Sequence, residues 1–279
     1  IVIKINLNII NAEVVNVITK AKSQNTRRNK MKLILSDINY LKNPIDVIHG
    51  LVIESRFTFN KEGISLLSMD PAGVCFIYFK IIKDAFNSYV LDKDLDICLK
   101  VIDLKNTIKK SSESDILIIE YEEPRLILTL KGKTTKIFKI NTINLEEKDY
   151  KEPKVKFDCL VKTKSSIIKE AINACNIGGD GESLSINLKS KELIFHTENN
   201  NNEASCTIKS SNETEISCSK ETISKISIDY LNKVIEGSKL SENITLELST
   251  DYPLKVNYVI PDRLQLYFII APRIETKGD

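Results

Sequence analysis

The stretch DYPLKVNYVIPDRLQLYFIIAPRIE, residues 251–275, decides how the chain folds. Apolar side chains occupy every second position over Leu254–Ile260, and the same alternation returns over Leu264–Ile270. The Pro-Asp-Arg sequence between the two runs is typical of a turn. The pattern therefore predicts a β-hairpin with one buried face. We expect the chain to leave the sheet at Ala271-Pro272, because proline cannot donate a hydrogen bond to a strand ladder.

The composition is that of a chain long enough for two domains. It has 279 residues, of which 42% are hydrophobic and 28% are charged, and chains of this length commonly divide. The 40 basic and 38 acidic residues leave a formal net charge of +2. That balance excludes a protein that binds nucleic acid through overall charge, so any DNA contact has to come from local asymmetry.

The sequence carries no sign of a membrane or secreted protein. No window approaches the roughly 18 apolar residues of a membrane-spanning helix, and the first thirty residues lack the pattern of a signal peptide. The six cysteines show no CxxC spacing and stand mostly in apolar or strand-like contexts. We therefore expect reduced, mostly buried thiols in an intracellular protein rather than a disulfide framework.

Changes in composition divide the chain into four parts. Residues 1–30 are predicted to lie outside the main fold, as an extension or a misplaced start, or else to form a basic arm that touches nucleic acid or a partner. Residues 31–141 form a first domain. Residues 142–156 are charged and have no apolar face, which is typical of a linker, and residues 157–276 form a second domain.

The two domains repeat one order of elements at an offset of about 130 residues, which indicates a duplicated domain. The matched pairs are Lys61-Glu62 with Lys191-Glu192, Asp103 with Asp229, and Pro124 with Pro253. The predicted fold class is α+β, with two duplicated antiparallel-sheet domains that carry their helices on one face.

No group of residues indicates catalysis or a cofactor. His49 and His196 stand far apart, without a cysteine or carboxylate at ligand spacing. The run Gly178–Gly181 lacks the lysine and Ser/Thr of a phosphate-binding loop. The DKDLD sequence at 92–96 has isoleucine where a calcium loop needs glycine. We therefore expect no enzyme, no cofactor and no metal.

Two separated motifs resemble one known family. GISLLSMDPAGVCFIYFK, residues 63–80, and the closing DYPLKVNY with APRIE resemble the sliding clamps of the proliferating cell nuclear antigen (PCNA) family, in their archaeal form. The resemblance runs from about residue 31 to residue 275. It implies a DNA clamp fold in which three subunits close head to tail into a ring, with the helices lining the hole. The edge strands that meet between subunits should lie at 133–140 and about 200–209.

The resemblance also implies a function. A ring of this family encircles duplex DNA without reading its sequence and tethers DNA polymerase and other replication or repair proteins. A separate ATP-driven clamp loader opens it. Such a protein is cytoplasmic in an archaeon and nuclear in a eukaryote.

Two sets of site residues follow from the resemblance. Partners insert a short motif with apolar anchors into a groove under the linker, and the tail from Ala271 is expected to be a non-repeated wall of that groove. The groove positions are Met69, Gly73, Val74, Phe76, Tyr150, Pro153, Pro253, Ile269, Ala271, Pro272 and Ile274.

The second set faces DNA and needs only diffuse positive charge to contact phosphates. These positions are Lys42, Lys105, Lys109, Lys110, Lys164, Lys169, Lys233 and Lys239. Acidic residues such as Asp46 and Glu236 stand on the same helices, so weak, sliding contact is expected. The alternatives are one subunit of a heterotrimeric or checkpoint-type clamp, or a nucleic-acid-binding scaffold that forms no ring.

Overall fold

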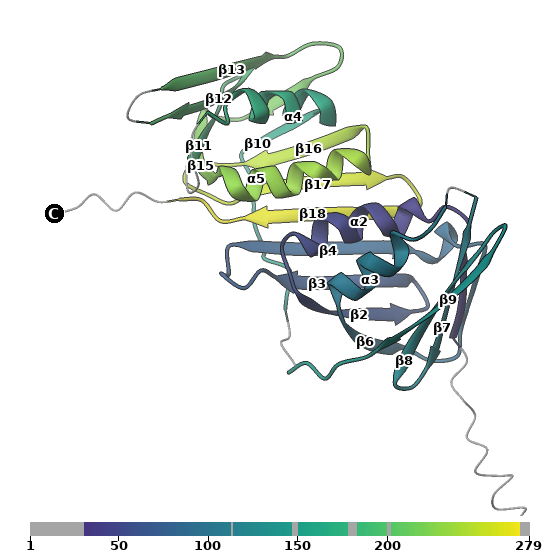
Figure 1. The fold of residues 1–279 in the computed structure, drawn as a ribbon. Helices are drawn as coiled ribbons and strands as arrows, with labels where there is room; N and C mark the ends of the chain where they lie inside the picture. The colour runs from purple at the N-terminus through teal and green to yellow at the C-terminus, as the bar shows by residue number, and fades with distance from the viewer. Residues whose placement is uncertain (1–30, 113, 147–149, 178–182, 200–201, 274–279) are drawn as a thin grey trace, which may run out of the picture.

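A computed structural model of the chain describes residues 31–112, 114–146, 150–177, 183–199 and 202–273 (Figure 1). Two predictions fall wholly outside these ranges, namely the extension over residues 1–30 and the groove residue Ile274, and the run Gly178–Gly181 lies outside them as well.

The first repeat runs from residue 31 to residue 141. Its elements are β1 (Met31–Leu35), α2 (Asn39–His49), β2 (Glu54–Asn60), β3 (Gly63–Met69), β4 (Cys75–Ile82), the 3-10 helix η1 (Lys83–Ala85), β5 (Ser88–Leu91), β6 (Leu95–Lys100), α3 (Val101–Ile108), β7 (Ile116–Glu122), β8 (Arg125–Lys131) and β9 (Thr135–Asn141).

The second repeat begins at residue 159. Its elements are β10 (Cys159–Lys164), α4 (Ser165–Ala174), β11 (Ser183–Leu188), β12 (Glu192–Glu198), β13 (Glu203–Lys209), β14 (Glu215–Cys218), β15 (Thr222–Ser227), α5 (Ile228–Val234), the 3-10 helix η2 (Ile235–Lys239), β16 (Asn243–Leu248), β17 (Leu254–Ile260) and β18 (Leu264–Ile270). The hairpin predicted at 254–270 is confirmed as β17 and β18.

A nine-stranded antiparallel sheet runs through both repeats, in the order β14-β10-β16-β17-β18-β4-β3-β2-β6. Its two halves join where β18 pairs with β4, from Leu264 opposite Ile81 to Ile270 opposite Cys75. The helices lie together on one face, here called the helix face (Figure 1). On β18, alternate residues such as Leu266 point into the core under the helices, and the residues between them point to the outer face.

The sheet orders of the two repeats match strand for strand. The order β5-β1-β7-β8-β9 corresponds to β14-β10-β16-β17-β18, and β6-β2-β3-β4 corresponds to β15-β11-β12-β13. Strand β9 is therefore the copy of β18, and β13 is the copy of β4. Both copies stand at the ends of their sheets and have the same alternating exposure. They cover most of the two edge strands expected at 133–140 and 200–209.

Each residue pair that suggested the repeat differs by one position from the correspondence that the structure gives. Strand register and burial match Leu126 with Leu254, both core residues that pair with the last apolar residue of the next strand. Pro253 is therefore the copy of Arg125, not of Pro124. The cause is that loops between equivalent strands differ in length from one repeat to the other. The duplication itself is unaffected.

The tail after β18 is repeated, contrary to the expectation of a non-repeated addition. The amide of Arg273 donates to the carbonyl of Lys225 on β15 at 2.7 Å, and the amide of Ile143 donates to the carbonyl of Cys98 on β6 at 3.0 Å. Both segments cover the free edge of the equivalent strand. The start of the linker and the start of the tail are thus copies of each other.

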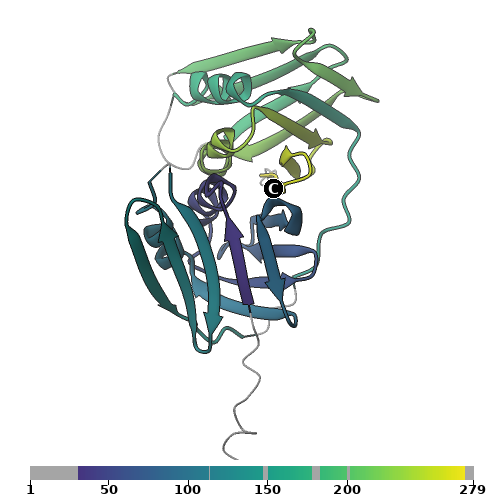
Figure 2. The same ribbon diagram turned by 90° about the vertical axis from the view of Figure 1, so that its right-hand side faces the viewer.

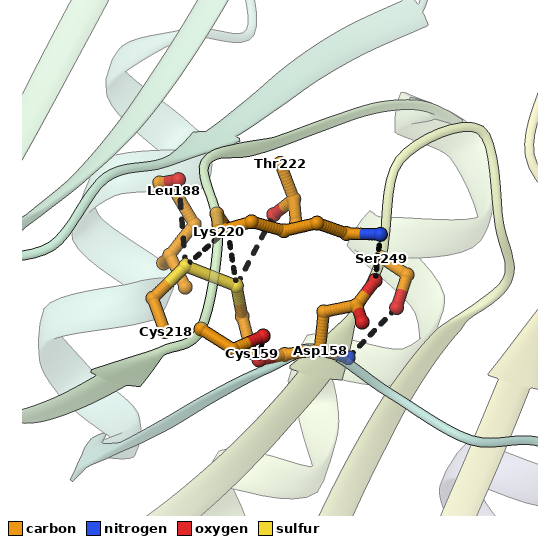
Figure 3. Close-up of polar contacts among 8 residues, drawn as sticks. Asp158, Cys159, Leu188, Cys218, Lys220, Thr222 and Ser249 are labelled. Carbon is orange, nitrogen blue, oxygen red and sulfur yellow. Dashed lines mark hydrogen bonds and ion pairs between the residues drawn. A yellow bond between two sulfur atoms is a disulfide. The ribbon is translucent and has the colours of Figure 1, made fainter.

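The prediction that all six cysteines are reduced is wrong. Cys159 and Cys218 form a disulfide across β10 and β14, with their Cα atoms 4.2 Å apart (Figure 3). Beside it, Asp158 forms an ion pair with Lys220 at 3.0 Å, and its amide donates to the Ser249 hydroxyl at 2.8 Å. The short strand β14 had not been predicted, so the sequence did not bring Cys218 opposite Cys159. The other four cysteines are free.

Candidate functional site

A small apolar cluster lies on the outer face of the sheet, where the two repeats join. Phe76 on β4 stands directly opposite Ile269 on β18, and Tyr78 stands opposite Tyr267. The tyrosine rings are stacked with centroids 4.6 Å apart. Phe76, Tyr267 and Ile269 are buried, with at most 5% of each exposed. This outer cluster is separate from the main core, which lies on the helix face of the same strands.

The linker between the repeats covers this outer cluster. Tyr150 and Val155 of the linker pack against it, together with Met69 at the end of β3 and its neighbour Leu67. Figure 2 shows the linker as an extended segment along the outer side of the molecule. The structure therefore brings together four of the predicted groove residues, namely Met69, Phe76, Tyr150 and Ile269.

The β3–β4 turn, residues 70–74, borders the outer cluster. Gly73 has a φ of +71°, a backbone conformation that suits glycine. Val74 accepts a hydrogen bond at its carbonyl from the amide of Ala271 at 2.9 Å, which joins the turn to the tail. Three half-buried prolines lie nearby. Pro153 belongs to the linker, Pro253 directly precedes β17, and Pro272 belongs to the tail. Ile274 lies outside the described residues.

Sequence reasoning missed Leu67, Tyr78, Val155 and Tyr267 as members of the outer cluster. A usable signal was present, since residues two apart on a strand share a face. Tyr267 is two positions from Ile269, and Tyr78 is two positions from Phe76. Which of the two sheet faces is covered by helices could not be decided from the pattern alone.

Tyr267 has an unusual environment for a buried tyrosine. The Lys255 ammonium lies 4.5 Å from the centre of its ring, a distance at which cation and ring attract each other. Burial, and then the nearby carboxylate of Glu152, raise the pKa of the Tyr267 hydroxyl. The ring therefore stays a neutral, flat surface beneath the linker.

A cavity of about 490 Å³ continues from the outer cluster under the linker. It shares Leu67, Met69 and Tyr150 with the cluster, and its remaining lining is mainly polar. That polar part contains Glu54, Ser55, Arg56, Thr58, Ser68, Asp96 and Glu146. An apolar site that opens into a polar cavity suits a peptide with apolar anchors and a polar flank.

The second candidate surface is the helix face with its lysines. Several of these are neutralised by neighbouring carboxylates. Lys105 pairs with Asp46 at 3.4 Å, and Lys169 pairs with Glu236 at 2.8 Å. Hydrogen bonds from Lys169 and Lys239 hold the pKa of Glu236 below its ordinary value.

Lys164, just before α4, pairs with Glu213 and Glu242. The other four lysines of the predicted set, Lys42, Lys109, Lys110 and Lys233, form no ion pair with any described residue. Lys109, Lys110 and Lys233 are exposed, and Lys42 is half-buried. Within the predicted set, these four side chains carry the positive charge that no described carboxylate neutralises.

Metal and membrane chemistry gain no support from the described part of the chain. Over those residues, no three His, Cys, Asp or Glu side chains are grouped so that they could hold a metal ion. No helix there is long and apolar enough to cross a membrane.

A duplicated α+β subunit with helices on one face and an open strand at each end is the fold of the DNA sliding clamps. Models of the N-terminal and C-terminal domains of proliferating cell nuclear antigen match residues 30–154 and 151–273. The chain belongs to the proliferating cell nuclear antigen family.

Its similarity to curated relatives extends over almost their whole length. A protein named DNA polymerase sliding clamp from Nanoarchaeum equitans is 29% identical over 248 residues, which are 87% of this chain and 99% of the relative. Proteins of the same name from Pyrococcus abyssi and Methanobrevibacter smithii are 28% and 27% identical. These alignments cover 83% and 88% of this chain, and 93% and 98% of the relatives.

Proposed function

We propose that copies of this chain close into a ring that encircles duplex DNA and holds DNA polymerase on it as a processivity factor. The observation that carries the proposal is the junction of β18 with β4. The same two strand types recur as β9 and β13, at sheet ends with no partner strand in the described chain. Unpaired edges of this kind invite pairing with another chain.

The internal junction gives the register of the proposed contact between subunits. Transferring the pairing of β18 with β4 onto the copies puts Lys139 of β9 opposite Glu203 of β13, a favourable cross-strand pair. It also puts Ile137 opposite Ser205. Ile137 is 60% exposed in the single chain, so pairing would cover it.

An open cavity of about 660 Å³ lies between α3 and β9 and supports the same contact. Asn106 and Lys110 line it from the helix side, and Phe138 and Ile140 line it from the strand side. At the closed junction, the corresponding side of α5 is occupied by the β3–β4 turn, since Tyr230 contacts Asp70.

The contact is head to tail, because β9 and β13 are different surfaces. Such contacts produce rings when the rotation closes. Three copies are proposed, in line with the family resemblance, with the helix face lining the hole. The four lysines that form no ion pair with a described residue would contact phosphates without reading bases. Because carboxylates neutralise the other lysines, we expect weak, salt-sensitive contact.

The outer cluster and the cavity under the linker are the proposed docking groove for DNA polymerase, the clamp loader and other proteins with a clamp-binding peptide motif. The role is that of an accessory protein inside the cell, and we assign it no catalytic step. Ring opening would then depend on a separate loader.

Covalent closure around DNA tests the encircling role. The double variant Lys139→Cys/Glu203→Cys is threaded onto a linear duplex, the duplex is ligated into a circle, the protein is oxidised, and the complex is washed in high salt. The protein should remain on the circle and should leave when a restriction enzyme linearises it. Each single variant serves as a control that cannot close. Retention that survives linearisation, or no retention at all, would contradict the ring.

A further inference from the structure

The β3–β4 turn at the edge of the outer cluster is shaped by one buried carboxylate. Asp70 is only 6% exposed. Its Oδ1 accepts hydrogen bonds from the amides of Val74 at 2.7 Å and Cys75 at 2.6 Å, and its Oδ2 accepts one from the amide of Ala72 at 3.1 Å. The position of Val74, a predicted groove residue, therefore depends on this carboxylate.

A fourth donor reaches the same carboxylate from the other repeat. The hydroxyl of Tyr230 on α5 donates to Asp70 Oδ2 at 2.5 Å, although the two residues are 160 positions apart in the chain. Tyr230 also lies beneath the Lys233 ammonium, 5.5 Å from its ring centre. In Figure 1 the β3–β4 turn and the last residues of β18 lie at the same end of the sheet. The hydrogen bond thus joins a helix of the helix face to a wall of the groove.

The positions in the two repeats that correspond to this pair hold other residues. Helix α3 is the copy of α5, and matching Val101 with Ile228 puts Asp103 at the position of Tyr230. Strand register puts Asn199 at the position of Asp70, and its side chain accepts from the amide of Asn202 at 2.9 Å. The copied positions therefore hold an aspartate and an asparagine in place of the tyrosine and the aspartate. The pair occurs at the junction that also carries the linker and the groove.

We propose that Tyr230 and Asp70 are positioning residues of the peptide groove: their hydrogen bond holds the β3–β4 turn in the shape that receives a partner peptide. The inference rests on the proposed groove and adds to it a residue on the opposite, helix-bearing side of the sheet. Loss of the Tyr230 hydroxyl should loosen the β3–β4 turn, while the apolar side chains of the outer cluster stay in place.

The ionisation of the pair supports a stable hydrogen bond at neutral pH. Burial alone would raise the pKa of Asp70, but donation from Tyr230 and from the amides of Cys75, Val74 and Ala72 outweighs it, and the pKa lies below its ordinary value of 3.8. Burial and the Asp70 carboxylate raise the pKa of the Tyr230 hydroxyl. The stabilisation is present above the ordinary pKa of Asp70 and is lost only as the pH falls through its lower folded value.

The test removes one oxygen atom. Tyr230→Phe in the full chain should bind a fluorescein-labelled helical-turn peptide, with apolar anchors at i, i+3 and i+4, about tenfold more weakly than the unmodified chain. Fluorescence anisotropy measures this affinity. Amide hydrogen exchange should accelerate at residues 72–75 and stay unchanged in β17. After Asp70→Asn, adding Tyr230→Phe should weaken binding by much less than tenfold, because the two residues act through one hydrogen bond.

The matched control is Tyr40→Phe. Tyr40 is a half-buried tyrosine on α2 whose hydroxyl has no hydrogen bond to a described residue, and its loss should leave affinity unchanged. If the unmodified chain binds the peptide and Tyr230→Phe binds it within twofold, the inference is overturned and the groove stands. If the unmodified chain does not bind, the proposed groove is wrong and the inference falls with it.

Discussion

Strands β18 and β9 are copies of each other, but β18 is closed, with a partner strand on both sides, and β9 is open, with a partner strand on one side of the described chain. In β18, Phe268 is fully buried between β17 and β4. Its copy in β9, Phe138, pairs with Leu128 of β8 on one side and remains half-buried. The same position in the fold is therefore a core residue in one repeat and a half-buried residue on an edge strand in the other. The comparison teaches that the proposed contact between subunits has its template inside a single chain.

The first strand of each repeat gives a second comparison. Met31 of β1 stands opposite Leu91 of β5, and Cys159 of β10 stands opposite Cys218 of β14. These are equivalent positions at the start of each repeat. The first repeat closes this corner with two apolar side chains, and the second closes it with a covalent bond. The edge strand is therefore held to the first strand by apolar packing in one repeat and by a disulfide in the other.

Separate truncation of Phe268 and Phe138 should distinguish the closed strand β18 from the open strand β9. Phe268→Ala should lower the free energy of unfolding by about 3–5 kcal/mol, because it leaves a cavity in the core. Phe138→Ala should lower it by about 1 kcal/mol, because the side chain is only half-buried, but should weaken subunit association. Urea unfolding and sedimentation measure the two effects. Equal loss of stability in both variants would show that the edge is not open.

Removing the disulfide tests the second comparison. In the chain-entropy picture a cross-link over 59 residues stabilises by about 4 kcal/mol, and typical losses are about 2–4 kcal/mol. Cys218→Ser should show this loss in urea unfolding without reductant. Cys98→Ser is the control, since Cys98 is a free, half-buried cysteine, and it should change little. The denatured, unreduced chain should expose four reactive thiols, and six would contradict the disulfide.

Reversing charge at the open edge has a smaller effect at each contact. Lys139→Glu puts like charges opposite each other at the proposed interface, at a cost of roughly 1 kcal/mol per contact. Subunit association should weaken, and Glu203→Lys in the same chain should restore it. Sedimentation across a dilution series measures both steps. Failure of the second change to restore association would show that Lys139 and Glu203 do not face each other.

Much of the fold could be predicted from the sequence because local patterns determine it. Period-two alternation predicted the hairpin of β17 with β18, and the duplication was visible in repeated turn and helix signals. Short strands escaped for a physical reason, since β5 and β14 have four residues each. Two periods of alternation do not stand out from a loop.

The candidate site was only partly predictable. Met69, Phe76, Tyr150 and Ile269 were found through a family motif. Their neighbours in the outer cluster were missed, because sheet faces are assigned only once the helices are placed. The hydrogen bond from Tyr230 to Asp70 spans 160 residues, and no local pattern encodes a contact at that distance. The disulfide escaped for the same reason, since it depends on the pairing of β10 with β14.

The central claim is that the open edges β9 and β13 pair with each other as β18 pairs with β4. Sedimentation equilibrium of the purified chain alone tests it most directly. The account predicts a species of three times the 31.6 kDa chain mass, which should dissociate at higher protein concentration in the Lys139→Glu variant. A chain that stays monomeric alone and assembles only with sister chains would replace the homotrimer by a heteromer. A monomer that binds linear duplex DNA tightly would contradict the ring.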